Sequence, residues 1–564
     1  MRIVGGQIEG EKRSERLFAC IKMTEFGGWN LYSENNSCND SVKFYSVFSD
    51  IKKNTALCYS IDNQKSKQHT KEAFFMLNSI IYFEENSTKI FEKLENDFLK
   101  NPKNFAEYVY GITDELYKLG REMIKESLEM MDRMLQESPV RRKKWTVEAH
   151  HFKTLTTYLG DVTFQKTLFR NKETKEASYL LDRILEVEPN QRLTEDAVAE
   201  MLKEAVQTSY RRGGEQASLA AQVSRQTVKN KIHALEFPPD DSAPEQKKTV
   251  DYLYMDADED HVALQFHEKK GDLTKAENGG KNNGLAAKIA YVYEGKEKVL
   301  PEGGRRELIS CHYFCGTGSG QSNDEFWDGI HRYLERKYDL EKVKKIYLNA
   351  DGGGWIKAGI KRIAGVTYVL DGFHLEKCLA KLTSHLKKER REEALEEFRE
   401  TIRKKTKKGF QEQVENQKKE MPEWRNLKKV DEEAEYILSN WEAAKLRLEG
   451  KEGVLGSSTE SHVSHVLSDR MSSRPKGWSS QGAEKMARLR AYYLNGGDML
   501  ELVRYQKKEK PEEEEEKEIL SSTQMIRSEK NRHGDVGKYL ESISHSVSEQ
   551  VKKTAYFNAQ IWGL

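Results

Sequence analysis

The sequence lacks any run of about 18 consecutive apolar residues, the length that a membrane-spanning helix needs, so we expect no membrane span. Its first six residues, Met1–Gly6, also lack the apolar segment of a signal peptide. Cysteine is scarce, because six cysteines in 564 residues are too few for a disulfide framework. A reducing compartment suits this composition, and we therefore expect a cytoplasmic protein.

The chain also has almost no net charge. Its 93 Lys and Arg residues nearly balance 92 Asp and Glu residues, which leaves a formal charge of +1. Overall charge therefore neither favours nor excludes nucleic acid as a partner. Hydrophobic residues make up 37% and charged residues 33%. With this length, the composition predicts several domains with true cores and heavily charged surfaces.

Two apolar segments that read as strands contain acidic residues, which is the most informative feature present. Tyr252–Leu264 carries Asp256 and Asp258 in its middle, and Ile346–Asp351 ends in an acid and opens into Gly352–Gly354. A carboxylate in a buried strand is costly unless it is paired or binds a metal. The pattern favours a divalent-metal site for phosphodiester chemistry. Asp256 and Asp258 point to the same face of one strand, so spacing alone does not separate them.

The segments after residue 250 predict an α/β domain. Strands are expected at 252–266, 288–293 and 306–314, followed by a helix at 324–338, a strand at 346–351, a helix at 355–363 and a strand at 366–370. The order βββαβαβ, with acids in the first and fourth strands, is typical of an RNase H-like core whose later strands are parallel. Such a core needs a third carboxylate from a later helix. Glu460 is the candidate, because Ser458 and Thr459 can begin a helix that has it in the first turn.

Residues 193–235 predict three short helices, the first of them broken at Gly213-Gly214. The apolar positions between Leu219 and Ile232 suit a helix-turn-helix whose second helix begins at Ser224. The outward side chains would be of types that read base edges and phosphates, namely Arg225, Gln226, Lys229 and Asn230. An ordinary helical hairpin is the alternative.

Composition and periodicity divide the chain into eight regions. They are an N-terminal extension (1–75), a helical region (76–140), a β-hairpin region (141–190), the helix-turn-helix (191–236), the first part of the RNase H-like core (250–374), a helical insertion (375–450), the final part of the core with Glu460 (451–500) and a charged C-terminal tail (501–564).

Four motifs, in order, carry a family resemblance. They are Tyr254–Val262 (YMDADEDHV), Asn349–Lys357 (NADGGGWIK), Leu370–Leu375 (LDGFHL) and Glu460–Trp478 (ESHVSHVLSDRMSSRPKGW). Together they resemble the ISLre-type insertion-sequence transposases, which have also been filed as an uncharacterised protein family. The resemblance covers roughly residues 80 to 500, continues weakly to the C-terminus and excludes residues 1–75.

The resemblance implies a bacterial DDE transposase. It makes Asp258, Asp351 and Glu460 the catalytic residues and the ligands of two Mg²⁺ or Mn²⁺ ions, which in such sites lie about 3.5–4 Å apart. Asp371 and His374 resemble the D-x-x-H signature of Mutator-like relatives. The implied partners are double-stranded DNA, both terminal inverted repeats and target, and further copies of the chain in a synaptic complex. The protein would then be nucleoid-associated when bound to DNA.

Three alternatives remain from the residues. The chain could be a sequence-specific DNA-binding protein derived from a transposase and catalytically inactive, or a structure-selective nuclease of the same fold. The glycine-rich stretch Gly316–Gly320 also hints at dinucleotide binding, but Gln321 stands where the G-x-G-x-x-G fingerprint needs its last glycine.

Overall fold

The structure is a computed structural model. It describes residues 20–23, 29–32, 79, 82–239, 246–265, 283–318, 322–419, 421, 427–451, 453–474 and 476–507. The chain divides into two compact units, one formed by residues 1–77 and 522–564 and the other by residues 78–521. In the first unit only the antiparallel strands β1 (Cys20–Met23) and β2 (Trp29–Tyr32) are described. Most of the predicted extension and tail lies outside the described residues. So do residues 319–321, which are the end of the glycine-rich stretch and Gln321.

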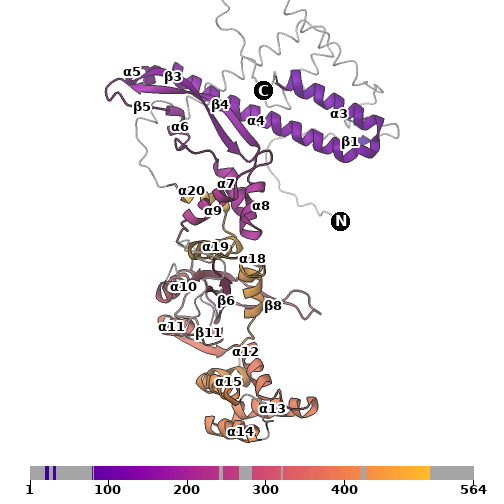
Figure 1. The fold of residues 1–564 in the computed structure, drawn as a ribbon, viewed down its shortest axis with the longest axis vertical. Helices are drawn as coiled ribbons and strands as arrows, with labels where there is room; N and C mark the ends of the chain where they lie inside the picture. The colour runs from indigo at the N-terminus through magenta and orange to yellow at the C-terminus, as the bar shows by residue number, and fades with distance from the viewer. Residues whose placement is uncertain are drawn as a thin grey trace, which may run out of the picture. The chain divides into compact units, whose positions relative to one another are not determined.

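The second unit begins with helices and a long hairpin (Figure 1). These elements are α3 (Thr88–Lys100), α4 (Phe105–Glu137), α5 (Pro139–Lys144), β3 (Trp145–Thr157), β4 (Gly160–Asn171) and β5 (Ala177–Ser178). The hairpin predicted within 141–190 is formed by β3 and β4, and its turn is Tyr158-Leu159. Gly160 begins β4 with a φ of 131°, a conformation that glycine adopts without strain. No described helix is long and apolar enough to cross a membrane.

Four helices follow: α6 (Leu180–Ile184), α7 (Glu195–Gln207), α8 (Tyr210–Gln216) and α9 (Arg225–Ala234). The predicted break at Gly213-Gly214 is wrong, because both glycines lie inside α8. They are needed for close packing, since a Cβ on Gly213 would lie 2.7 Å from the Cβ of Ala205. Ser224 caps α9 as predicted, accepting a hydrogen bond of 3.1 Å from the N–H of Thr227.

A five-stranded mixed sheet forms the centre of this unit, and it confirms the α/β class. Its strands are β6 (Tyr252–Ala263), β7 (Gly284–Tyr293), β10 (His312–Thr317), β11 (Lys345–Ala350) and β12 (Val366–Leu370). Their spatial order is β10-β7-β6-β11-β12. The first three strands of this sheet in chain order, β6, β7 and β10, pair antiparallel, whereas β6, β11 and β12 are parallel. The parallel strands are joined through α10 (Asn323–Lys337) and α11 (Gly354–Arg362).

The single strand predicted at 306–314 is wrong, because the chain forms two strands there. Ser310 adopts a φ of 52° and separates β9 (Arg306–Ile309) from β10. β9 pairs instead with β8 (Gly295–Lys298) in a separate two-stranded ribbon. A single residue with positive φ does not interrupt the pattern of apolar residues in the sequence, so the pattern predicts one continuous strand across Ser310.

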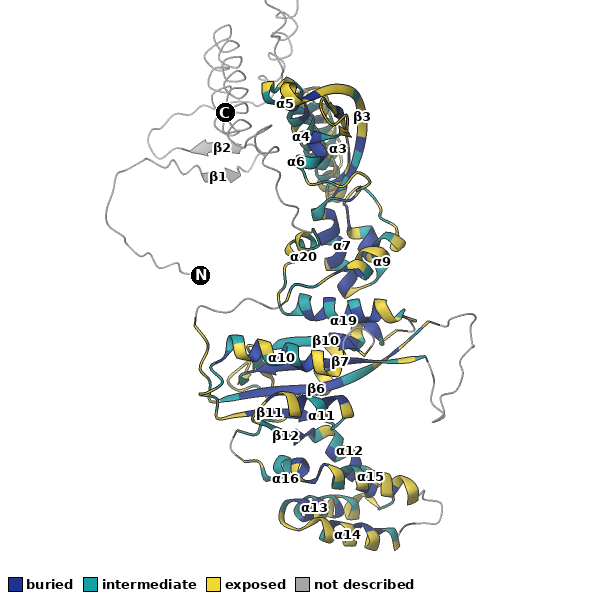
Figure 2. Ribbon diagram, turned by 90° about the vertical axis from the view of Figure 1, so that its left-hand side faces the viewer, coloured by how far each residue is buried: buried dark blue, intermediate teal, exposed yellow. Residues whose placement is uncertain are grey.

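Helices cover both faces of the sheet (Figure 2). Alternate residues of β6 face opposite sides. Leu253 and Met255 pack with α10 and α11, whereas Tyr254 and Val262 pack on the opposite side. The elements of that opposite side are α17 (Thr459–His462), η4 (Val463–Ser468), α18 (Asp469–Met471), α19 (Ser480–Leu494) and α20 (Met499–Tyr505). Buried residues of α7 and α9 belong to the same hydrophobic cluster.

Between β12 and α17 the chain forms a helical group with its own core. Its helices are α12 (Gly372–Leu382), α13 (Lys388–Lys404), α14 (Lys407–Lys419), α15 (Leu427–Ser439) and α16 (Trp441–Glu449). Leu375, Leu379 and Leu382 are buried in this core together with Leu370 of β12. The helical group therefore covers the β12 edge of the sheet, which would otherwise expose unpaired backbone groups.

Candidate active site

Asp258 and Asp351 lie beside each other on neighbouring parallel strands. The last residues that β6 and β11 pair are Ala257 and Ala350, and each aspartate follows directly. Burial is the main cause that raises the pKa of Asp258 to about 6. The negative charge of Asp351 raises this pKa further, whereas a hydrogen bond of 2.8 Å from the N–H of Glu259 lowers it. Two carboxylates that repel each other in this way form a site that favours a bound cation.

A glycine turn fixes the position of Asp351. Its Oδ1 accepts a hydrogen bond of 2.9 Å from the N–H of Gly353. Gly352 between them has a φ of 86°, and a Cβ there would lie 2.7 Å from both Asn440 Oδ1 and Tyr368 Oη. Any residue larger than glycine would therefore displace the turn that holds the carboxylate.

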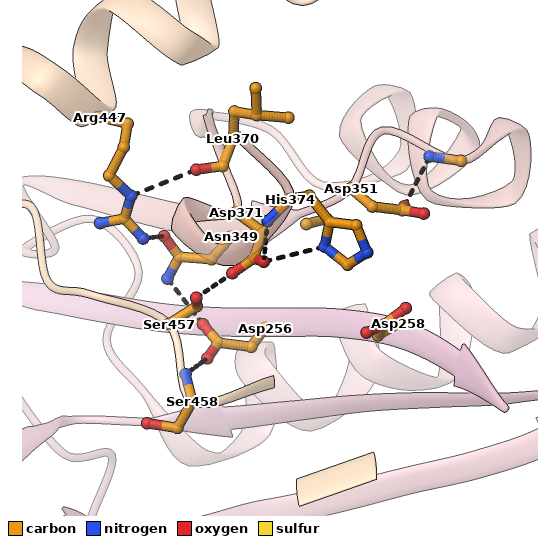
Figure 3. Close-up of polar contacts among 12 residues, drawn as sticks. Asp256, Asp258, Asn349, Asp351, Leu370, Asp371, His374, Arg447, Ser457 and Ser458 are labelled. Atoms are coloured by element: carbon orange, nitrogen blue, oxygen red, sulfur yellow. Dashed lines mark hydrogen bonds and ion pairs between the residues drawn. The ribbon is translucent and has the colours of Figure 1, made fainter. Parts of the chain in front are cut away.

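A third carboxylate, Asp371, follows β12 at the same edge of the sheet. β12 pairs with β11 up to Leu370 and Ala350, so Asp371 lies next to the position of Asp351. Its side chain caps α12, accepts the N–H of His374 at 3.1 Å and contacts His374 Nδ1 at 2.9 Å (Figure 3). Burial would raise the pKa of Asp371, but hydrogen bonds from His374 and Ser457 outweigh it and lower the pKa. The hydrogen bond to Asp371 in turn raises the pKa of His374.

Asp256 is fully buried and accepts four hydrogen bonds. The donors are Tyr291 Oη at 2.7 Å, Tyr293 Oη at 3.1 Å, Asn349 Nδ2 at 2.7 Å and the N–H of Ser458 at 3.2 Å. Burial raises its pKa. A carboxylate has about four acceptor positions, so Asp256 has none left for a ligand.

Asp258 differs from Asp256 in this respect. In the described part of the chain its only hydrogen-bond donor is the N–H of Glu259. The two aspartates that spacing could not separate are therefore distinguished by their partners, and Asp258 is the one with free acceptor positions.

The structure does not bring Glu460 together with the two aspartates. Glu460 lies in α17, where it is exposed and its carboxylate forms no hydrogen bond or ion pair with the described residues. Among these residues no three His, Cys, Asp or Glu side chains are grouped so that they could hold a metal ion. Asp258 and Asp351 offer only carboxylate oxygens, the ligands that hard cations such as Mg²⁺ prefer. The donor chemistry of this pair therefore fits such a cation.

The candidate DNA-binding residues lie together on one side of α9. Val228 and Ile232 are buried beneath it, whereas Arg225, Gln226 and Asn230 are exposed and Lys229 is half-buried. Gln226 Nε2 donates a hydrogen bond of 2.8 Å to Asn230 Oδ1. These side chains thus form a polar surface that is separate from the aspartates in sequence and in element.

The sequence pattern did not identify the partners of Asp256. Tyr291 and Tyr293 alternate along β7 and face the acidic strand, but a tyrosine at such spacing is an ordinary strand residue. Ser457 and Ser458 stand just before Glu460, yet they indicate only a helix start. Contacts between residues about 200 positions apart leave no signal in a single sequence.

Comparisons with known proteins agree on one family. The model of the uncharacterised protein family UPF0236 matches residues 98–509. A UPF0236 protein of Caldanaerobacter subterraneus subsp. tengcongensis is 34% identical over 436 residues, 77% of this chain and 86% of that protein, and its name joins eleven locus designations. Another from the same organism, whose name joins four, has the same identity and coverage. A UPF0236 protein in the vanSb 3′ region of Streptococcus gallolyticus is 23% identical over 415 residues, 71% of this chain and 85% of that protein.

Among solved structures, the Drosophila P element transposase strand transfer complex matches 57% of this chain and 83% of that chain, with 10% identity and a TM-score of 0.22. The sequence matches are much stronger than this structural one. On the extent of the family match and the identity of its relatives, this chain belongs to the uncharacterised protein family UPF0236.

Proposed function

We propose that this protein is a DDE transposase of the ISLre type, which cleaves and joins DNA strands at the ends of an insertion sequence. The observation that carries the proposal is the placement of Asp258 and Asp351 side by side, each directly after the last residue that pairs between the parallel strands β6 and β11. The sheet order β10-β7-β6-β11-β12, three strands antiparallel and then two parallel, supports an RNase H-like core. Such a core would present the catalytic carboxylates where the parallel strands end.

Asp258 and Asp351 would hold Mg²⁺ or Mn²⁺. Glu460, which lies apart from them in this structure, would complete the set when DNA and metal bind. When bound, such ions activate the attacking oxygen and stabilise the leaving oxygen. The turn at Gly352 keeps the Asp351 carboxylate oriented for this task. His374 contacts Asp371 through Nδ1, which leaves Nε2 to donate a hydrogen bond to a DNA phosphate.

DNA recognition would use the surface of α9, as in a helix-turn-helix. Arg225, Gln226, Lys229 and Asn230 would contact the terminal inverted repeats, while a separate surface holds the target DNA. Contacts to phosphate would make binding weaken steeply as salt increases.

One further observation supports a mobile element. The names of the relatives join up to eleven locus designations in one genome, which is what repeated insertion of one gene produces.

An exposed apolar stripe on α4 points to self-association. Val109, Leu116 and Met123 are all exposed, and they recur every seven residues, the spacing at which one position of a coiled-coil seam repeats. We propose that a second copy of the chain covers this stripe in the synaptic complex. The protein would act on the nucleoid in the bacterial cytoplasm.

The test is to incubate the purified protein with DNA that carries its own gene and both flanks, with Mg²⁺ or Mn²⁺, and to map the strand breaks. Breaks at both ends of the element, dependent on the metal, are expected. Specific binding without breaks would favour an inactive DNA-binding protein. Breaks at branched or flapped DNA of unrelated sequence would favour a structure-selective nuclease.

A further inference from the structure

The segment Gly456–Ser458, which leads into α17, is tied to the sheet at several points. Lys296 of β8 donates from Nζ to the carbonyl oxygen of Gly456 and to Ser458 Oγ, both at 2.6 Å. Ser457 Oγ donates to Asp371 Oδ1. The N–H of Ser458 donates to Asp256 Oδ2 at 3.2 Å. The backbone is therefore fixed immediately before the helix that carries Glu460.

Asp256 is the innermost of these anchors. Its other three donors come from within the sheet: Tyr291 and Tyr293 from β7 and Asn349 from β11. The four bonds hold the carboxylate in one orientation, with Oδ2 directed at the N–H of Ser458 (Figure 3). Burial of a carboxylate costs free energy unless the group is hydrogen-bonded, and these four bonds offset that cost. Loss of any one of them would leave an acceptor position of Asp256 unsatisfied.

A half-buried arginine extends the same anchor. Arg447 of α16 donates from Nη1 to the carbonyl oxygen of Leu455 at 2.8 Å and from Nη2 to Asn349 Oδ1 at 3.5 Å. Its Nε donates to the carbonyl oxygen of Leu370 at 3.2 Å. The chain that returns from the helical group is thus bonded to β11 and β12 just before it reaches Asp256.

We propose that Asp256 is a positioning residue that docks Gly456–Ser458 on the sheet and thereby fixes where α17, with Glu460, begins. This inference depends on the proposed function for the role of Glu460, but the docking itself does not. The two aspartates of β6 then divide the work. Asp258 keeps acceptor positions for the reaction, and Asp256 uses all of its own to hold the segment that supplies the third carboxylate.

The experiment compares Asp256→Asn with Asp258→Asn in the full chain, by hydrogen exchange of the 456–460 amides and by cleavage kinetics on element ends. The asparagine at 256 keeps the shape but replaces one acceptor oxygen with a donor. Amide exchange at 456–460 should become about 10- to 100-fold faster, because a hydrogen bond to a buried charged group is removed. The kcat of cleavage should fall while KM for the DNA ends stays within about twofold, because α9 is untouched.

The matched control should behave in the opposite way, so that Asp258→Asn abolishes cleavage and leaves exchange at 456–460 unchanged. The exchanged pair Asp256→Asn with Asn349→Asp returns a carboxylate to the same network and should restore part of both the protection and the cleavage. If Asp256→Asn does not fold, Tyr291→Phe removes one donor to the same oxygen and should speed exchange at 456–460 to a smaller degree.

Loss of cleavage in Asp256→Asn with unchanged exchange would overturn the proposal, because Asp256 would then act in the reaction itself. Unchanged exchange in Asp256→Asn, or in Tyr291→Phe where Asp256→Asn does not fold, would overturn it as well. If the wild-type protein cleaves no DNA, the proposed function fails, yet the exchange comparison still decides whether Asp256 docks the segment.

Discussion

At the scale of single residues, the two aspartates of β6 show how partners, rather than position, assign roles. Both lie on the same face of one strand, and both are buried. The sequence predicted that acids lie in this strand, but it could not rank them. The two are distinguished by their hydrogen-bond donors: Asp256, but not Asp258, has its acceptor positions filled, by Tyr291, Tyr293, Asn349 and Ser458.

Asp258 should reduce the stability of the metal-free protein. Its pKa rises from 3.8 to about 6 on folding, so the folded chain binds more protons than the unfolded chain between these values, and stability falls as pH rises through this window. At pH 7 the cost is at most about 3 kcal/mol. We predict that Asp258→Asn increases the free energy of unfolding by up to this amount at pH 7 and by almost nothing at pH 4.

Urea unfolding at both pH values measures this effect. Addition of Mg²⁺ or Mn²⁺ should stabilise the wild-type protein and leave Asp258→Asn unchanged. A variant that is less stable than the wild type at pH 7 would contradict the assignment, because it would mean that the carboxylate of Asp258 is held by favourable contacts.

At the scale of elements, sequence periodicity identified the regular parts and missed the irregular ones. The strand predicted at 366–370 has the observed bounds, because its apolar residues run between clear stops. The prediction at 306–314 failed at Ser310, whose positive φ no pattern reports. Gly213 and Gly214 suggested a break, yet they serve close packing of α8 on α7 and of α8 on the segment that leads into α9.

The exposed side of α9 should bind DNA through charge. We predict that Arg225→Ala with Lys229→Ala weakens binding to element ends and lowers the slope of log affinity against log salt by about 0.9 for each phosphate that the variant no longer neutralises. Fluorescence anisotropy at several salt concentrations measures both. Lys93→Ala with Lys100→Ala in α3, an equal change of charge, is the control. Equal effects of the two pairs would show that α9 has no special role.

At the scale of the whole second unit, buried arginines join α7, which packs beside α9, to the helices that cover one face of the five-stranded sheet. Arg470 donates from Nε to the carbonyl oxygen of Ala205 at 3.0 Å. Arg490 donates to the carbonyl oxygens of Val206 at 3.4 Å and Val466 at 2.7 Å. The end of α7 is therefore bonded to the helices that follow Glu460. A fixed distance between the bound sequence and the cleaved bond is the expected consequence.

Self-association should depend on the exposed stripe of α4. We predict that Leu116→Asp, at the middle of the stripe, shifts the protein to a monomer, because a charge at a coiled-coil seam position is buried without a partner. Sedimentation velocity over a range of concentrations measures this shift. Lys93→Asp in α3 lies off the stripe and should leave association unchanged. A wild-type protein that is monomeric with and without DNA ends would remove this role from α4.

In the proposed reaction Asp351, beside Asp258, would take part in metal-dependent strand cleavage. The most direct measurement places wild type and Asp351→Asn side by side on DNA containing both element ends, with binding and cleavage read from the same samples. We expect near-normal binding and no cleavage by Asp351→Asn, because the substitution would remove one charged metal ligand and keep the shape of the turn at Gly352. Cleavage at the wild-type rate, or equal loss of binding and cleavage, would contradict it.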